Sequence, residues 1–260
     1  MGTWMTGTAQ KKVAIKELRV HTYHQRTSKL EKRLRREMRI WGNLDHVNIV
    51  SLHGVTFSFG KCPAMVCEWM NQGTLADYIE EEHVNLDYRG RLNICLAITR
   101  GLSYLHSQKV IHGDLSPANV LMDGDVAHLS DFGLSNVIAE LQGPSFFTSK
   151  VSCAARWIAP ELQSSQDSAP KLAMPGDIYS FASVAFYIMT GIFPFAHLRH
   201  EYQIIAEILR NIQAGLNPSP SRPASSFLTD ECWDILMMCW ALDPAKRPDI
   251  CDVERRFNQL

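Results

Sequence analysis

The chain has 260 residues, of which 46% are hydrophobic, and its formal net charge at pH 7 is −1. This size and composition suit a globular protein with a full core, and the near-zero charge gives no whole-chain electrostatic reason to bind nucleic acid or an anionic membrane. Its seven cysteines are odd in number and lack paired spacing, and no secretory leader is seen, so we expect free thiols in an intracellular, cytoplasmic protein.

The first seventy residues predict a mainly β region with one helix. Strand patterns extend to about Val20, a helix is expected from roughly Ser28 to Gly42, and two or three strands follow up to Trp69. The helix region carries the basic residues Lys29, Lys32, Arg33, Arg35, Arg36 and Arg39. Because they surround a helix, we interpret them as a solvated face and not as a nucleic-acid site.

From Thr74 onward the sequence is mainly helical. Apolar residues at helical spacing predict a long helix from Tyr88 to Ser107. The most apolar stretch, residues 178–195, is interrupted by serine, threonine, glycine and proline. We therefore interpret it as a buried helix at the centre of the larger lobe and not as a membrane span. Residues 217–223 predict a surface loop, and Cys232 and Cys239 are expected in the core.

Two clusters in the middle of the chain carry most of the functional information. In residues 111–121, Asp114 is followed five residues later by Asn119, and in residues 129–133 Asp131 begins an Asp-Phe-Gly sequence. Mg²⁺ prefers hard oxygen ligands, such as a carboxylate and a side-chain amide. A phosphoryl group in transfer needs positioning and neutralisation of the charge on its oxygens. Flanking apolar residues predict short buried strands that would fix these polar groups.

These clusters resemble the catalytic segments of the protein kinase family, and further motifs match in order along almost the whole chain. Val-Ala-Ile-Lys ends at Lys16, Arg-Glu-Met contains Glu37, and Ala-Pro-Glu contains Glu161. Other matching stretches are residues 64–75, 177–181 and 239–248. Residues 156–161 and 240–248 are most similar to the tyrosine-kinase-like group.

The resemblance implies an α+β, two-lobed protein kinase fold that forms one domain over residues 1–260. Residues 1–70 would form an incomplete, mainly β N-lobe and the start of the hinge, and residues 71–260 a larger, mainly α C-lobe. In the C-lobe, Arg247 would pair with Glu161. The implied activity is transfer of the γ-phosphoryl group of Mg-ATP to a protein hydroxyl, serine or threonine in preference to tyrosine, in signal transduction. Neither nucleic acid nor membrane is expected as a partner, and the oligomeric state stays open.

The resemblance also implies a catalytic role for each matching polar residue. Asp114 would orient or accept the proton of the substrate hydroxyl. Lys16, held by an ion pair with Glu37, would contact the ATP phosphates. Asn119 and Asp131 would hold Mg²⁺ ions on those phosphates.

The nucleotide site that the resemblance implies lies at the hinge between the lobes. Cys67 occupies the position that gates the deeper pocket. Glu68 and Met70 would offer a backbone C=O and N–H to adenine. Ala14 and Leu121 would also bind ATP, together with Lys16 and Asp131.

The start of the chain departs from the family pattern. No Gly-x-Gly-x-x-Gly precedes Val13, so the resemblance predicts a kinase domain that is truncated at its N-terminus or begins without a phosphate lid. Residues 1–6 satisfy a myristoylation pattern. Because Gly2 to Trp4 align with the strand that precedes the lysine strand in kinases, we favour a strand inside the domain over a lipid anchor.

Three further positions depart from the pattern. Gly113 replaces an arginine that in many kinases reads an activation-loop phosphate, which predicts weak dependence on loop phosphorylation. The candidate loop sites are Ser145, Thr148, Ser149 and Ser152. Ser116 replaces a lysine, and Ala154 a threonine, that serine/threonine kinases commonly carry, so the choice between serine/threonine and tyrosine substrates stays open.

Two functions from different classes remain. All five residues of the catalytic set are present, which favours an ATP-dependent protein kinase. The absent glycine loop and Ser116 motivate the alternative, a pseudokinase-like, non-catalytic binding module or a fragment lacking the phosphate lid. A small-molecule kinase is disfavoured, because Asp-Phe-Gly followed by Ala-Pro-Glu delimits a platform for protein substrates.

Overall fold

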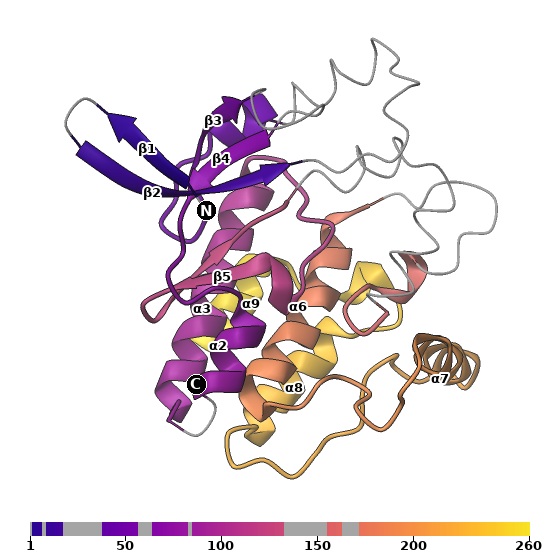
Figure 1. The fold of residues 1–260 in the computed structure, drawn as a ribbon. Coiled ribbons are helices and arrows are strands. Elements are labelled where there is room, and N and C mark those ends of the chain that lie inside the picture. The colour runs from indigo at the N-terminus through magenta and orange to yellow at the C-terminus, as the bar shows by residue number, and fades with distance from the viewer. Residues whose placement is uncertain are drawn as a thin grey trace.

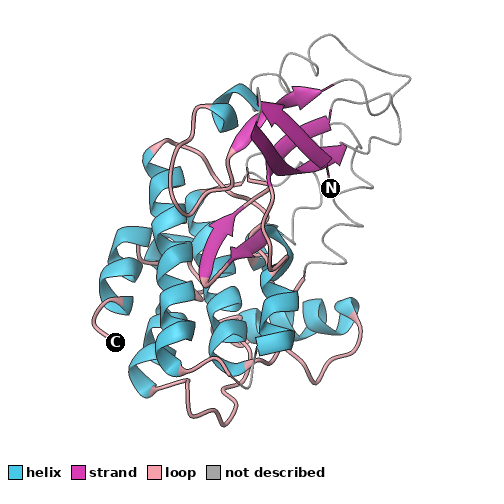
Figure 2. Ribbon diagram, turned by 60° about the vertical axis from the view of Figure 1, so that its left-hand side comes forward, coloured by secondary structure: helices cyan, strands magenta, loops and turns pink. Residues whose placement is uncertain are grey.

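The computed structural model describes residues 2–6, 9–17, 38–56, 64–82, 85–132, 155–162 and 172–260. A small lobe built on an antiparallel sheet lies above a larger lobe built of helices (Figure 1). A two-stranded hairpin lies between them, as the strands in Figure 2 show. The predicted α+β, two-lobed architecture is confirmed, whereas the division of the domain at residue 70 stays a prediction.

The described part of the small lobe contains four strands in the order β1-β2-β4-β3. They are β1 (Gly2–Thr6), β2 (Ala9–Glu17), β3 (Leu52–Thr56) and β4 (Ala64–Glu68). β1 pairs antiparallel with β2, from Gly2 opposite Val13 to Thr6 opposite Ala9. The strand expected at the first residues is therefore confirmed, and it is an edge strand of this sheet.

The end of one further helix packs against the hydrophobic core. Residues 38–42 are helical, and the rest of the helix expected from Ser28 lies outside the described residues, with all of the basic cluster except Arg39. Met38 and Trp41 are three positions apart and both are buried, so this turn presents an apolar face to the core. The Trp41 indole N–H donates to the Val50 carbonyl at 2.8 Å, which fixes the orientation of the ring.

The hairpin consists of β5 (Val120–Asp123) and β6 (Val126–Leu129). Alternate residues face the core, so Val120 and Leu129 are fully buried and lie opposite each other. This hairpin confirms the short strands expected between Asn119 and Asp131. The residues just before Asp114 do not form a strand, because side chains and not a neighbouring strand hold their backbone, as described below.

The described part of the helical lobe contains six α-helices. They are α2 (Leu75–Glu82), α3 (Tyr88–Ser107), α6 (Met174–Thr190), α7 (Glu201–Gln213), α8 (Asp230–Cys239) and α9 (Ile250–Phe257). α3 has the predicted bounds, and it starts where the Asp87 carboxylate accepts the Gly90 N–H at 2.7 Å. Cys232 and Cys239 are buried, as expected, and residues 217–223 form the predicted loop. Within the described ranges, no helix is both long and apolar enough to cross a bilayer.

The central helix α6 differs from its predicted range of 178–195. It is buried along almost its whole length, as expected, but it ends at Thr190. Gly191 adopts a φ of 70° and its N–H returns to the Tyr187 carbonyl at 2.8 Å, which terminates the helix. The apolar run continues past this glycine into a turn, where Ile192 and Phe193 are exposed. Hydropathy alone could not mark the break.

Candidate active site

The two polar residues of the first motif contact each other directly. The Asn119 side-chain amide donates to the Asp114 carboxylate at 2.9 Å and to the Asp114 carbonyl at 2.7 Å. The Asn119 carbonyl accepts the Ser130 N–H at 2.9 Å and its hydroxyl at 3.0 Å. Because the NH₂ group of Asn119 faces Asp114, its amide oxygen is the side-chain atom left to act as a ligand.

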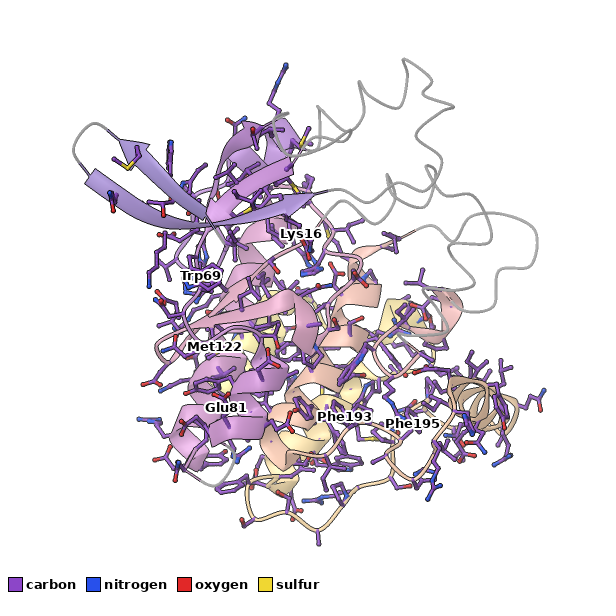
Figure 3. The ribbon with its side chains drawn as sticks, viewed as in Figure 1. Lys16, Trp69, Glu81, Met122, Phe193 and Phe195 are labelled. Atoms are coloured by element: carbon purple, nitrogen blue, oxygen red, sulfur yellow. The ribbon has the colours of Figure 1, made fainter. Side chains whose placement is uncertain are left out.

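The aspartate of the second motif lies directly after β6 and pairs with Lys16 of β2. Lys16 lies where the sheet meets the helical lobe (Figure 3), so this ion pair joins the two lobes. Asp131 has a φ of 59°, a left-handed conformation that is uncommon for residues other than glycine. Such backbone strain is concentrated at functional sites. The structure thus brings Lys16 of the small lobe into direct contact with Asp131, which follows the hairpin.

An aromatic column lies behind these polar residues. The Phe132 ring is buried, and its centroid lies 5.0 Å from that of Trp41 and 6.2 Å from that of His112. His112 is fully buried, and burial lowers its pKa, so its ring is neutral at pH 7. The column connects the end of the small-lobe helix to both motif segments. Its members were not predicted as site residues, although His112 and Phe132 lie within the two central motif segments.

A buried carboxylate clamps the backbone just before Asp114. Asp177, in the first turn of α6, accepts the N–H of His112 at 2.9 Å and the N–H of Gly113 at 2.8 Å. His106 Nε2 also lies 2.8 Å from the Asp177 carboxylate. Sequence reasoning expected Asp177 only at the start of a helix. An acidic residue at the head of an otherwise apolar helix is the signal that indicates a buried, fully bonded carboxylate.

The hinge residues surround the inner end of the site. Cys67 lies opposite Ala14 in the pairing of β4 with β2, and it is buried. The pKa of the Cys67 thiol is raised to about 12, mainly by burial and secondly by the nearby Asp131 carboxylate. Cys67 is therefore a neutral, unreactive side chain at the position predicted to gate the deeper pocket.

The hairpin closes this region from below. Leu121 forms an isolated bridge with Thr74, and the Met122 N–H donates to the Gly73 carbonyl at 2.9 Å. Glu68 ends β4 and its carboxylate pairs with Lys11 at 2.8 Å, while Met70 is buried. The segment between the lobes is thus joined to the hairpin that carries Asn119 and Asp131 at its ends.

The sequence matches the family model described as protein tyrosine and serine/threonine kinase over residues 1–257. The chain belongs to this family. It is 31% identical over 251 residues to the serine/threonine/tyrosine-protein kinase HT1 of Arabidopsis thaliana, which is 94% of this chain and 59% of that protein. It is 29% identical over 251 residues to the serine/threonine-protein kinase TNNI3K of Mus musculus, which is 95% of this chain and 28% of that protein.

Another relative is the serine/threonine-protein kinase STY17 of Arabidopsis thaliana, 28% identical over 262 residues, which is 100% of this chain and 42% of that protein. The chain therefore spans less than two thirds of the length of these relatives. It is a protein kinase domain that resembles the tyrosine-kinase-like group.

The kinase domain also contains the predicted ion pair at the end of the activation segment. Arg247 donates to the two carboxylate oxygens of Glu161 at 2.6 and 2.9 Å. The arginine side chain is fully buried and also donates to the Pro175 carbonyl at 2.9 Å and the Ala241 carbonyl at 3.0 Å. This confirms the pair implied by the resemblance.

Several features expected of the kinase domain lie outside the described residues. They are Glu37, Gly133, Ala154 and the candidate phosphorylation sites Ser145, Thr148, Ser149 and Ser152. The pair between Lys16 and Glu37 therefore stays a prediction. Among the residues that are described, no three His, Cys, Asp or Glu side chains gather into a metal site.

Proposed function

We propose that this protein kinase domain transfers the γ-phosphoryl group of ATP to a serine or threonine hydroxyl of a protein substrate, in preference to tyrosine. The observation that carries the proposal is the convergence of two polar pairs, Lys16 with Asp131 and Asp114 with Asn119, at the junction of the lobes. The preference for serine and threonine is supported by STY17 and TNNI3K, which are named serine/threonine-protein kinases, whereas the name of HT1 adds tyrosine.

Asp114 is the proposed acceptor of the hydroxyl proton. Its carboxylate receives the Asn119 amide at 2.9 Å, which fixes the orientation of the carboxylate relative to Asn119. As the hydroxyl oxygen attacks the γ-phosphorus, its proton passes to Asp114 and the bond from phosphorus to the bridging oxygen of ADP breaks. Lys16 offers its ammonium to the phosphate oxygens, and the proposed pair with Glu37 would hold it there.

Asn119 and Asp131 are the proposed Mg²⁺ ligands. An amide oxygen and a carboxylate are the hard donors that this ion prefers, and the orientation of Asn119 directs its amide oxygen away from Asp114. When bound, Mg²⁺ neutralises charge on the phosphate oxygens. Two protein ligands suffice, because Mg²⁺ commonly completes its coordination with phosphate and water.

Five residues are the proposed contacts of the adenine. They are Ala14, Cys67, Glu68, Met70 and Leu121. The pairing of Ala14 with Cys67 in the sheet and the bridge between Thr74 and Leu121 support this assignment. Because the Cys67 thiol is neutral, it would act there by its size and apolar surface.

The first test is binding of Mg-ATP, measured as a rise in melting temperature. We expect a rise in the parent and none in Lys16→Met or Asp131→Asn, because each removes a phosphate or metal contact. At 100 times the dissociation constant, the stabilisation is about 2.7 kcal/mol. Lys11→Met is the matched control, because Lys11 lies on the same strand but pairs with Glu68 at 2.8 Å. It should keep the full rise.

The second arm measures phosphotransfer to serine, threonine and tyrosine peptides. Asp114→Asn should lower kcat by about 10² to 10⁴ while keeping the thermal response to Mg-ATP. A folded parent with no response to Mg-ATP and no transfer would contradict the proposal. That outcome would favour a non-catalytic binding module of the kinase family.

A further inference from the structure

Two apolar side chains are exposed immediately after α6. Ile192 is 40% exposed and Phe193 is 47% exposed; we call this pair the aromatic shelf. The Phe193 ring stacks on Tyr187 at 4.8 Å with an interplanar angle of 2°, and its centroid lies 6.1 Å from that of Trp157. Tyr187 and Trp157 are buried. Phe193 is thus the outer ring of a stack anchored in the core, so it is held rigidly at the surface.

One side of the aromatic shelf is bordered by the acidic helix α2. The Tyr187 hydroxyl donates to the Ala76 carbonyl of that helix at 3.5 Å. Asp77 and Glu80 are exposed and three positions apart, so they share a face. The pKa of Tyr187 is raised by burial and then by the charges of Glu80 and Asp77.

The charge on this face is not neutralised from within α2. The helix has no basic residue, and among the described ion pairs none involves Glu80. Asp77 accepts the Thr74 hydroxyl at 2.6 Å and so also caps the helix. A partner that covers the aromatic shelf therefore gains from positive charge beside an apolar group.

The helix α6 sets the distance between the aromatic shelf and the proposed reaction site. Asp177 at its start accepts the N–H of Gly113, the residue before Asp114. Tyr187 lies ten residues further along, which is about 15 Å at the rise of an α-helix. An extended chain covers that distance in about five residues. A substrate with its hydroxyl at Asp114 can therefore reach the aromatic shelf with a residue about five to eight positions away.

We propose that the aromatic shelf and the acidic face of α2 dock a segment of the protein substrate. The segment carries a large apolar residue next to lysine or arginine, about five to eight residues from the phosphorylated hydroxyl. This proposal rests on the proposed function. A second copy of the chain fits less well, because a symmetric contact would bring the same carboxylates together. An anionic membrane would be repelled by them.

The proposal is tested by peptide binding that does not depend on catalysis. Fluorescence anisotropy is measured on full-length Asp114→Asn chain with serine peptides that carry Phe-Arg, Phe-Glu or Ala-Ala six residues from the serine. We expect the Phe-Arg peptide to bind about fivefold to thirtyfold more tightly than the Ala-Ala peptide. The Phe-Glu peptide should bind more weakly than the Phe-Arg peptide.

Matched variants assign the effect to the aromatic shelf. Phe193→Ala should abolish most of the preference for Phe-Arg over Ala-Ala, and Glu80→Gln should reduce the preference for arginine over glutamate about twofold to fivefold at low salt. Tyr202→Ala is the control, because Tyr202 is a 68% exposed ring that stacks on His200 of another surface. Glu231→Gln is the charge control on α8. Both controls should keep the parent preferences.

Phosphotransfer assays separate this proposal from the proposed function. In the parent, the Phe-Arg peptide should have a lower KM than a short peptide that lacks the docking segment, at similar kcat, and Phe193→Ala should remove that difference. Equal binding of all three peptides, or equal losses in Tyr202→Ala, would overturn the docking site while transfer to the short peptide persists. Dimerisation that Phe193→Ala abolishes would assign the aromatic shelf to a second copy. If no peptide is phosphorylated but Phe-Arg still binds through Phe193, only the catalytic proposal fails.

Discussion

Gly113 shows how one residue without a side chain shapes the catalytic loop. Its φ of 72° lies in the left-handed region, and its N–H is held by Asp177 at 2.8 Å. A Cβ at this position would lie 2.5 Å from Leu172 Cδ1. The arginine that many kinases carry here would therefore have to displace Leu172. The weak dependence on loop phosphorylation that the sequence predicts stays a prediction.

Gly113→Ala should lower the free energy of unfolding by about 1–2 kcal/mol, because alanine is strained at positive φ. The Leu172 methyl is the end of a flexible side chain, so its displacement should add little. Gly42→Ala is the control, because Gly42 is helical and a Cβ there meets nothing within 4 Å. It should raise stability by up to about 1 kcal/mol. Urea unfolding measures both, and equal effects would contradict the assigned strain.

At the scale of elements, a single buried guanidinium joins three segments of the helical lobe. Arg247 follows the 3₁₀ turn Pro244–Lys246 and reaches Glu161 in the turn Pro160–Leu162 and the Pro175 carbonyl at the start of α6. All of its described bonds are to oxygen acceptors at 2.6 to 3.0 Å. This residue therefore holds the end of the activation segment against the central helix.

Arg247→Met should lower the free energy of unfolding by about 3 kcal/mol, because it leaves a carboxylate and two carbonyls without their buried donor. Arg255→Met is the control, because Arg255 pairs with Asp252 one turn away on the surface of α9. An exposed pair of this kind contributes about 0.5 kcal/mol. Chemical unfolding compares the two variants, and a loss in Arg247→Met no larger than in the control would show that the buried pair is not structural.

For the whole molecule, residues 46–50 are a principal connection between the lobes. The Leu129 N–H donates to the Asn48 carbonyl at 2.8 Å, and the Asn48 amide donates to the Ala127 carbonyl at 3.0 Å. The Asn48 N–H in turn donates to His46 Nδ1 at 3.1 Å, and the His46 ring stacks on Tyr104 of α3 at 4.9 Å. His46 must be neutral at Nδ1 to accept this bond.

Burial lowers the pKa of His46 below 6.5, so the unfolded chain binds a proton at this residue more readily than the folded chain. Stability should therefore fall as the pH drops below about 6.5, and this contribution is absent well above it. His46→Asn keeps a hydrogen-bond acceptor without the titration, so its stability should fall less between pH 7.5 and 5.5. Urea unfolding at both values measures the difference. Identical pH dependence in parent and variant would refute the role of His46.

The fold and site were predictable where the information is local. Apolar spacing marked the bounds of α3, and short apolar stretches marked the strands between Asn119 and Asp131. Each of these patterns depends only on which face of one element is buried. The ordered motifs identified the kinase family and, through the resemblance, the pair of Arg247 with Glu161.

The tertiary structure decided what depends on contacts between distant segments. Three contacts join residues whose spacing in the chain carries no signal. They are the ion pair of Lys16 with Asp131, the hydrogen bond from the Gly113 N–H to Asp177, and the stacking of Phe193 on Tyr187. The end of α6 at Thr190 was also hidden, because hydropathy continues past the glycine that breaks the helix. Local sequence determined the elements and the chemical groups. Packing decided which groups meet, because burial and hydrogen bonding are satisfied between elements and not within them.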